Sequence, residues 1–373
     1  MIPFNSPFMT GNELDYIAQA HRNAKFAGDG PFTKRCHEWL EQHLSVPQAL
    51  LTHSCTAALE MTALLTEIGP GDEVIMPSFT FVSTANAFVL RGGVPVFVDV
   101  RPDTLNINED LIETAITAKT KAIVVVHYAG VACEMDRIHA IARKYGLWLI
   151  EDAAHAILSR YRGKALGSLS DLACLSFHET KNIIAGEGGA LLVNRHEWRV
   201  RAEIIREKGT DRSQFFRGQV DKYSWRAVGS SFLPGELTAS FLLAQMEQAE
   251  SITRKRLDIW QQYHEALLPE ESIGTVRRPV VPEGCEHNGH MYYLIASSAR
   301  HQKRLIQGML ERGIQAVTHY VPLHQSEAGQ RFGKCPDPLP HTEDVAKRLL
   351  RLPLWIGVNT AAVIDAIKQV LRV

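Results

Sequence analysis

Residues 147–155 read Leu-Trp-Leu-Ile-Glu-Asp-Ala-Ala-His, an apolar run that ends in two adjacent carboxylates. Four consecutive apolar residues predict a strand that is buried on both faces, which is typical of a parallel sheet. A carboxylate at the end of such a strand must be hydrogen-bonded, paired with a charge or strongly perturbed. Asp152 therefore either caps the segment that follows or holds a cationic group, and the residues leave both interpretations open.

The same pattern extends outward from this strand. From about residue 48 to 195, short apolar runs alternate with helical patterns. This alternation predicts an α/β fold in which a mixed, mostly parallel sheet is sandwiched by helices. Ligands of such sheets bind beyond the carboxyl ends of the strands, so we expect the functional residues there. The predicted strands are 50–52, 73–76, 94–98, 121–126 and 147–150, and the predicted helices are 56–68, 81–91, one after Asn108, and 135–145.

The second half of the chain changes character. Residues 208–235 have little periodicity, and a loop this long inside a compact domain is usually functional or interfacial. One or two helices are expected over 236–267. A smaller α+β C-terminal domain is predicted from the later patterns, which are strands at 291–295 and 315–318 and helices at 301–312 and 361–371. We place the large domain, with an N-terminal arm, at 1–250 and the small one at 251–373.

Composition excludes several classes of protein. The 373 residues include 40 basic and 41 acidic side chains, for a formal net charge of −1. This gives no general electrostatic reason to bind nucleic acid or an anionic membrane. No apolar run approaches the roughly 18 residues of a membrane span, and no signal peptide is recognisable. The six cysteines lack metal-binding spacing, so we expect no metal site and free thiols in the cytoplasm.

Three more segments at strand ends carry chemistry. Residues 53–58 open a helix with small and hydroxyl side chains, which either cap it or offer N–H groups to a phosphate. Phe81 closes the segment 77–81 and either packs in the core or lies on a flat cofactor ring. Lys181 follows an apolar strand and precedes the glycine-rich 186–189. It is either a solvated surface lysine or, if enclosed, a former of Schiff bases with a lowered pKa.

Taken together with Asp152, these segments favour one interpretation. They supply a phosphate cup, an aromatic platform, a Schiff-base lysine and a partner for a pyridinium nitrogen, which are the parts of a pyridoxal phosphate site. A nicotinamide cofactor is not favoured, because no G-x-G-x-x-G sequence follows an early strand.

With these motifs, the chain resembles the DegT/DnrJ/EryC1/StrS sugar aminotransferase family over essentially its whole length. The resemblance implies the fold-type-I architecture of aspartate aminotransferase. It also implies pyridoxal 5'-phosphate as cofactor, with pyridoxamine 5'-phosphate as its aminated form, and a homodimer or dimer of dimers with sites at the interface. The motifs that carry the resemblance are 69–75, 151–155, 176–182, 186–189 and 319–324.

The resemblance also assigns roles by position. Lys181 matches the Schiff-base lysine and Asp152 the partner of the pyridine nitrogen. His155 matches a residue beside the ring and its phenolic oxygen, and Phe81 matches the residue that stacks on the ring. The implied phosphate cup consists of Cys55, Thr56, Ala57 and Ser176.

Residues 208–235 should reach a partner subunit's site. Many relatives have Gly-Tyr-Asn-Tyr-Arg where this chain has Gly-Ser-Ser-Phe-Leu at 229–233, so Ser231 replaces an asparagine that contacts the cofactor phosphate across the dimer. Lys222 and Tyr223 are candidates for contacts with the substrate. His319 and Tyr320 either approach the sugar nucleotide or pack within a C-terminal loop.

Residues 206–223 resemble one subgroup of the family most closely. That subgroup transfers the amino group of L-glutamate to C4 of dTDP-4-dehydro-6-deoxy-D-glucose, giving dTDP-4-amino-4,6-dideoxy-D-galactose and 2-oxoglutarate. The product serves surface polysaccharides such as enterobacterial common antigen. One alternative is amination of C3 of a related dTDP-keto sugar, which the cofactor motifs do not separate from C4. The other is a noncatalytic cofactor-binding regulator, although no helix-turn-helix extension precedes the fold.

Overall fold

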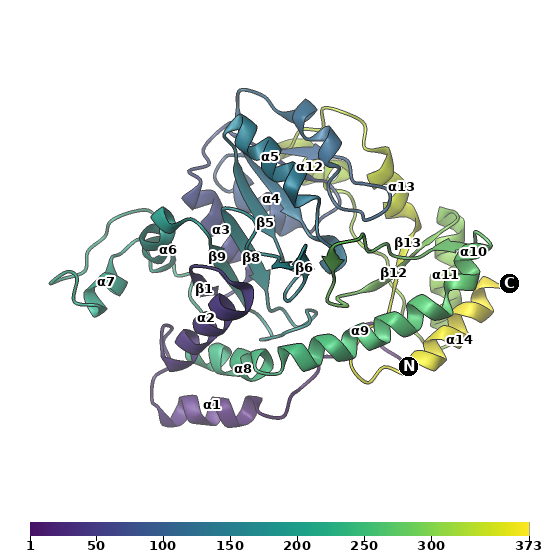
Figure 1. Cartoon of the computed structure of the whole chain (residues 1–373), viewed down its shortest axis with the longest axis horizontal. Coiled ribbons are helices and arrows are strands. Elements are labelled where there is room, and N and C mark those ends of the chain that lie inside the picture. Colours follow the sequence, from purple (N-terminus) through teal and green to yellow (C-terminus); the bar gives the residue numbers. More distant parts are fainter. Residues whose placement is uncertain (373) are drawn as a thin grey trace.

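The computed structural model describes residues 1–372 and is centred on a seven-stranded sheet with the order β1-β9-β8-β5-β4-β2-β3 (Figure 1). β9 is antiparallel to both of its neighbours, and every other adjacent pair in this sheet is parallel. The predicted mixed, mostly parallel sheet is therefore confirmed. The strands are β1 (Ala49–Thr52), β2 (Glu73–Pro77), β3 (Val94–Val98), β4 (Thr120–Val126), β5 (Trp148–Asp152), β8 (Leu172–Ser176) and β9 (Gly189–Val193).

Helices cover both faces of this sheet, which explains why its strands are apolar at every position. Leu51 packs with the helices of one face, while its neighbour Leu50 packs with those of the other. The first face carries α1 (Glu13–Arg22), α2 (Pro31–Leu44), α5 (Met135–Tyr145) and α8 (Glu236–Met246); the second carries α3 (Cys55–Leu65), α4 (Val82–Val89) and α6 (Arg199–Arg206). No helix within residues 1–372 is long and apolar enough to cross a membrane.

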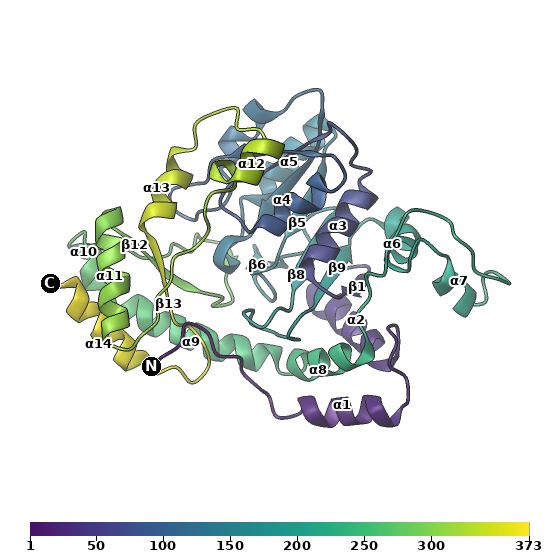
Figure 2. The ribbon, with the colours of Figure 1, turned by 180° about the vertical axis from the view of Figure 1, so that it is seen from behind.

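A second sheet, in the order β10-β12-β13, forms with its helices the smaller C-terminal unit (Figures 1 and 2). It is antiparallel and has its own hydrophobic cluster. Its elements are α10 (Leu268–Ser272), β10 (Val276–Arg277), β12 (Tyr292–Ala296), α11 (Ala299–Glu311), α13 (Pro340–Arg348), β13 (Leu349–Leu352) and α14 (Thr360–Leu371). The short helix α12 (Glu327–Phe332) lies between α11 and α13 in the chain but packs beside β3 of the large sheet. A short third sheet joins β6 (Arg160–Tyr161), β7 (Lys164–Ala165) and β11 (Cys285–Glu286).

The helix α9 (Ala249–Ala266) connects the two units. Ile252 packs into the core of the large sheet, whereas Trp260 and Tyr263 pack into the C-terminal cluster. The predicted boundary between residues 250 and 251 falls in the first turn of this helix. The helix belongs to both units, so that boundary stays a prediction.

Part of the segment 207–235 leaves the body of the molecule, whereas Glu207 and Phe232 near its ends are buried, and Phe232 packs in the core of the large sheet. Both views show the loop with α7 (Arg212–Phe216) extending away at the end opposite the C-terminal sheet (Figures 1 and 2). The long irregular segment predicted at 208–235 therefore contains one short helix, and its aromatic residues Phe216 and Trp225 are 70% and 79% exposed.

Two predicted elements are wrong. The expected helix after Asn108 is two short 3-10 turns, Glu109–Leu111 and Glu113–Ala115. The segment 112–120 is rich in β-branched Ile and Thr, which are poor helix formers, and the Thr120 hydroxyl accepts a hydrogen bond from the Thr117 N–H. The expected strand at 315–318 is a single bridge between Val317 and Arg351. The other helices and strands agree with the predictions to within a few residues.

Candidate active site

A cavity of about 650 Å³ opens at the carboxyl ends of β4, β5 and β8, between the N-termini of α3 and α4 and the C-terminal sheet. This is the position that the topology of an open α/β sheet favours for a ligand. Most of the predicted site residues line it: Cys55, Thr56, Phe81, Asp152, His155, Ser176, Lys181, His319 and Tyr320.

Lys181 lies in the loop that follows β8. The turn is closed by hydrogen bonds from the Lys181 N–H to the His178 oxygen and from the Glu179 N–H to the Gly186 oxygen. Gly186 has φ +76°, a conformation that favours glycine. Burial lowers the pKa of Lys181, and charge interactions with Cys55 and Asp152 act in the opposite direction. Within residues 1–372 its Nζ has no hydrogen bond or ion pair, so the amine is free to bond to a ligand, and its lowered pKa favours the uncharged form that reacts.

Asp152 ends β5 and turns its carboxylate to the same cavity. Its Oδ2 accepts a hydrogen bond of 2.7 Å from the Thr84 hydroxyl, and its Oδ1 accepts one of 3.2 Å from the Ala154 N–H. Burial raises the pKa of Asp152, while these hydrogen bonds and the charge of Lys181 oppose that rise. A cationic partner would stabilise the ionised carboxylate further.

Two helix N-termini meet at the cavity. Thr56 in the first turn of α3 and Ser83 in the first turn of α4 share a hydrogen bond of 2.7 Å between their hydroxyls. Helix N-termini carry partial positive charge and free N–H groups, which suits a phosphate. Ala57 was also predicted here, but it does not line the cavity, and its N–H donates to the Oγ of Ser54, the N-cap of α3. Ser83 was not predicted, because no strand or helix pattern connects it with Thr56.

An aromatic and histidine cluster forms the opposite wall. The rings of His155 and His290 stack at 4.3 Å, and those of His319 and Tyr320 at 3.6 Å. Burial holds the pKa values of all three histidines well below the usual range, so the cluster is uncharged at neutral pH. The Nδ1 of His155 is buried and has no hydrogen-bond partner in the described part of the chain, so it can accept or donate one bond to a ligand. Phe81 is 57% exposed and flanks this wall.

Besides Ala57, three further predicted residues lie outside this cavity. Lys222, Tyr223 and Ser231 are exposed residues of the segment 207–235. The backbone of Ser231 forms a bridge with Glu207 instead. The structure does not bring them to the site within one chain, and their contact with a partner subunit's site stays a prediction.

Several lining residues were missed by the sequence analysis. Besides Lys181, the lysine and arginine residues that line the cavity within residues 1–372 are Arg256 and Arg351. Phe4 and Asn5 of the N-terminal arm also line it. A signal existed for Arg351, since it is the one charged residue in the apolar stretch 349–354. Arg256 lies within an ordinary helical pattern, so nothing in the sequence pointed to it.

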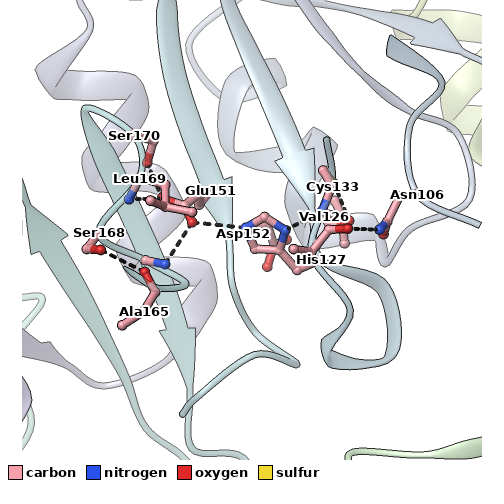
Figure 3. Close-up of polar contacts among 12 residues, drawn as sticks. Asn106, Val126, His127, Cys133, Glu151, Asp152, Ala165, Ser168, Leu169 and Ser170 are labelled. Atoms are coloured by element: carbon pink, nitrogen blue, oxygen red, sulfur yellow. Dashed lines mark hydrogen bonds and ion pairs between the residues drawn. The ribbon is translucent and has the colours of Figure 1, made fainter. Parts of the chain in front are cut away.

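Behind the site, a buried network holds the end of β5 (Figure 3). Glu151 is fully buried, and its Oε1 accepts hydrogen bonds from His127 Nε2 at 2.9 Å and the Gly167 N–H at 2.7 Å. Its Oε2 accepts from the Leu169 N–H and the Ser170 hydroxyl. Burial works to raise the pKa of Glu151, but the hydrogen bonds from His127, Gly167 and Ser170 outweigh it, so this pKa lies below its usual value. Glu151 thus anchors the strand end that positions Asp152.

Glu151→Gln is expected to lower the free energy of unfolding by about 2–4 kcal/mol, because the new amide would face two donors that then lack an acceptor. Urea unfolding of the purified protein measures this. Glu113→Gln is the matched control, because Glu113 forms an exposed ion pair with Lys144 and its loss should leave the unfolding midpoint unchanged. Equal midpoints for both variants would contradict the anchoring role.

These residues fit pyridoxal phosphate. The amine of Lys181 suits its aldehyde, and the carboxylate of Asp152 suits its ring nitrogen. The unpartnered Nδ1 of His155 suits its phenolic oxygen, and the paired helix N-termini suit its phosphate. When bound, the cofactor supplies an aldehyde carbon that bonds to amines and a ring that takes up electrons. Lys181 Nζ can then accept and return a proton, and Asp152 can keep a proton on the ring nitrogen. Fold and site together define a pyridoxal phosphate enzyme of the aminotransferase class.

Comparison with known proteins identifies the family. The model of the DegT/DnrJ/EryC1/StrS aminotransferase family matches residues 7–371, and the chain belongs to this family. The dTDP-4-dehydro-2,3,6-trideoxy-D-glucose 4-aminotransferase of Saccharopolyspora spinosa is 33% identical over 370 residues, which are 97% of this chain and 94% of that protein. The spore coat polysaccharide biosynthesis protein SpsC of Bacillus subtilis is 30% identical over 377 residues, covering 99% and 96%.

The solved structures agree. Spr1654 of Streptococcus pneumoniae in its pyridoxamine phosphate form has a TM-score of 0.92 and 27% identity, covering 100% of this chain and 99% of that one. The same protein is also known in its pyridoxal phosphate form, with a TM-score of 0.91. The predictions of the family, the fold type and the cofactor are confirmed. The chain is a sugar aminotransferase that uses pyridoxal phosphate and pyridoxamine phosphate.

Proposed function

We propose that this aminotransferase moves the amino group of L-glutamate to C4 of dTDP-4-dehydro-6-deoxy-D-glucose. The products are dTDP-4-amino-4,6-dideoxy-D-galactose and 2-oxoglutarate. The observation that carries the aminotransfer is the meeting of Lys181 and Asp152 in one cavity. At about 650 Å³, this cavity lies in the range of roughly 300–1,000 Å³ that holds a small organic ligand.

Two observations support C4 and the dTDP group. Residues 206–223 resemble the subgroup that carries out this reaction. The Saccharopolyspora relative is by its name a 4-aminotransferase of a dTDP-linked deoxy sugar, and it matches nearly the whole chain. C3 amination has no comparable support.

The likeness to a spore coat polysaccharide protein supports a role in making a surface polysaccharide, and we propose the enterobacterial common antigen type. We further propose that the enzyme is cytoplasmic and a homodimer or dimer of dimers. The exposed aromatic residues of the segment 207–235 support the dimer, because large exposed apolar groups commonly mark an interface.

The test is a product assay. Purified protein is incubated with pyridoxal phosphate, L-glutamate and dTDP-4-dehydro-6-deoxy-D-glucose, and the nucleotide sugar is examined by mass spectrometry and NMR. An axial amine at C4 is the expected result. If the enzyme takes the amino group from glutamate but leaves this sugar unchanged, the C4 proposal is wrong, and keto sugars aminated at C3 become the next substrates.

A further inference from the structure

His290 has a ring nitrogen that lies at the cavity without a partner. The residue lines the cavity just before β12, and its ring stacks on that of His155 at 4.3 Å. Its Nδ1 forms a hydrogen bond of 2.9 Å with the side-chain oxygen of Asn182. Its Nε2 has no hydrogen-bond partner within residues 1–372 and is not sealed from solvent, so it is open to a ligand in the cavity.

The surrounding hydrogen bonds decide which nitrogen of His290 carries the proton. The amide nitrogen of Asn182 donates at 2.9 Å to the backbone oxygen of Asn288, which can only accept. The amide oxygen of Asn182 must therefore face His290, and Nδ1 must donate to it. Burial, helped by the charge of Lys181, keeps the pKa of His290 well below its usual value, so the ring is neutral. A neutral ring with its proton on Nδ1 presents a bare lone pair at Nε2.

The structure also fixes His290 in position. Arg256 donates from Nη2 to the backbone oxygen of His290 at 2.8 Å. The side-chain oxygen of Asn288 accepts from the His290 N–H at 3.1 Å, and its amide nitrogen donates to the backbone oxygen of His155. The acceptor therefore has its direction before a ligand arrives, which lowers the entropic cost of the contact.

His319 offers the opposite function in the same cavity. The buried hydroxyl of Tyr128 has one partner among the described residues, the Nδ1 of His319 at 2.6 Å. A buried hydroxyl needs an acceptor for its proton, so Nδ1 of His319 accepts and its Nε2 carries the ring proton. The cavity thus has a donor at His319 and an acceptor at His290. Sugar hydroxyls can bond to either one, whereas carboxylate and keto oxygens have no proton to give to His290.

We propose that His290 accepts a hydrogen bond from the sugar hydroxyl next to the keto carbon, and so selects acceptors that carry this hydroxyl. The inference rests on the proposed function in one respect, that the hydroxyl is the one at C3 of dTDP-4-dehydro-6-deoxy-D-glucose. Lys181 lies within electrostatic reach of both His290 and His319. The keto carbon reacts at this lysine, so the neighbouring carbon of the sugar comes to the same wall. An acceptor without the hydroxyl leaves the lone pair of His290 without a donor, which costs binding energy.

The test compares two sugars in one enzyme. The pyridoxamine phosphate form is mixed with dTDP-4-dehydro-6-deoxy-D-glucose or with its 3-deoxy analogue, and kcat/KM is measured for each from the absorbance of the cofactor. We expect the wild type to prefer the hydroxylated sugar by about 10-fold to 100-fold, the effect of one hydrogen bond to an enclosed acceptor. In His290→Asn this preference should fall to about threefold or less. The shorter amide can keep the contact with Asn182 but does not reach the position of Nε2.

A second variant separates recognition from structural support. His290→Gln brings an amide oxygen near the position of Nε2 and gives up the contact of Nδ1 with Asn182. It should therefore retain more of the preference than His290→Asn, whereas a purely structural role predicts the reverse order. His287→Asn is the matched control, because His287 lies in the same turn and does not line the cavity, and its preference should equal that of the wild type.

The preference is a ratio within each variant, so a general loss of activity cancels. A wild type that uses both sugars equally well would overturn the proposal, and so would a wild-type preference that persists in His290→Asn. If the enzyme aminates C3 instead, the C4 proposal is wrong, and the ratio is measured with dTDP-3-dehydro-6-deoxy-D-glucose and its 2-deoxy and 4-deoxy analogues. Failure of the proposed acceptor and failure of the proposed role of His290 are therefore distinguishable.

Discussion

Lys181→Ala is expected to abolish transamination, with turnover reduced by about 10⁴-fold or more. The variant removes the amine that bonds to the cofactor and the group that moves protons at the substrate carbon. No other lysine lines the cavity among the described residues, so none can take its place. The removed amine has no hydrogen bond or ion pair to any described residue, and its loss should leave the fold intact.

Turnover of glutamate with the keto sugar measures the effect. Absorbance of the holoenzyme should also change, because the visible band of the bond between lysine and cofactor is lost. Lys164→Ala is the matched control, since Lys164 is an exposed residue of β7. Turnover of Lys181→Ala within tenfold of the control would mean that another residue carries the chemistry.

Sequence alone predicted the half of the site that lies at strand ends. Asp152 and Ser176 each end a continuous apolar strand, and the carboxyl ends of parallel strands meet at one edge of the sheet. Lys181 follows five residues later, in a turn that its glycines predict. The positions of these residues therefore depend mainly on local patterns, and local patterns can be read without a structure.

The other half depends on contacts between distant segments. Arg351 reaches the cavity because β13 pairs with β12, and Phe4 reaches it because the N-terminal arm runs beside the C-terminal unit. No periodicity records such pairings. The wrong helix after Asn108 has a different cause, because hydroxyl and β-branched residues there favour local hydrogen bonds over a continued helix.

Asp152→Asn is expected to lower turnover by about 10²-fold to 10³-fold while leaving the fold nearly unchanged. The asparagine keeps the shape of the side chain. Its Oδ1 can accept from the Ala154 N–H, and its amide can donate to the Thr84 hydroxyl, which can turn toward Thr80. What the substitution removes is the ability to carry a negative charge, which the hydrogen bonds from Thr84 and Ala154 favour and burial opposes.

The sign of the pKa shift makes this variant informative. Burial raises the pKa of Asp152 and thereby favours the neutral acid, whose shape and neutrality asparagine imitates. If the neutral form sufficed for catalysis, Asp152→Asn would turn over like the wild type. A large loss means that the ionised carboxylate is the working form, and that a protonated ring nitrogen stabilises it against the cost of burial.

Asp171→Asn provides the control for loss of a carboxylate at the same sheet. Asp171 accepts a hydrogen bond from the Leu149 N–H and pairs with Arg195, away from the cavity. We expect its substitution to affect stability but leave turnover near that of the wild type. A loss of turnover in Asp152→Asn that does not exceed the loss in Asp171→Asn would show that the charge at Asp152 is structural, and the ring nitrogen would then need another partner.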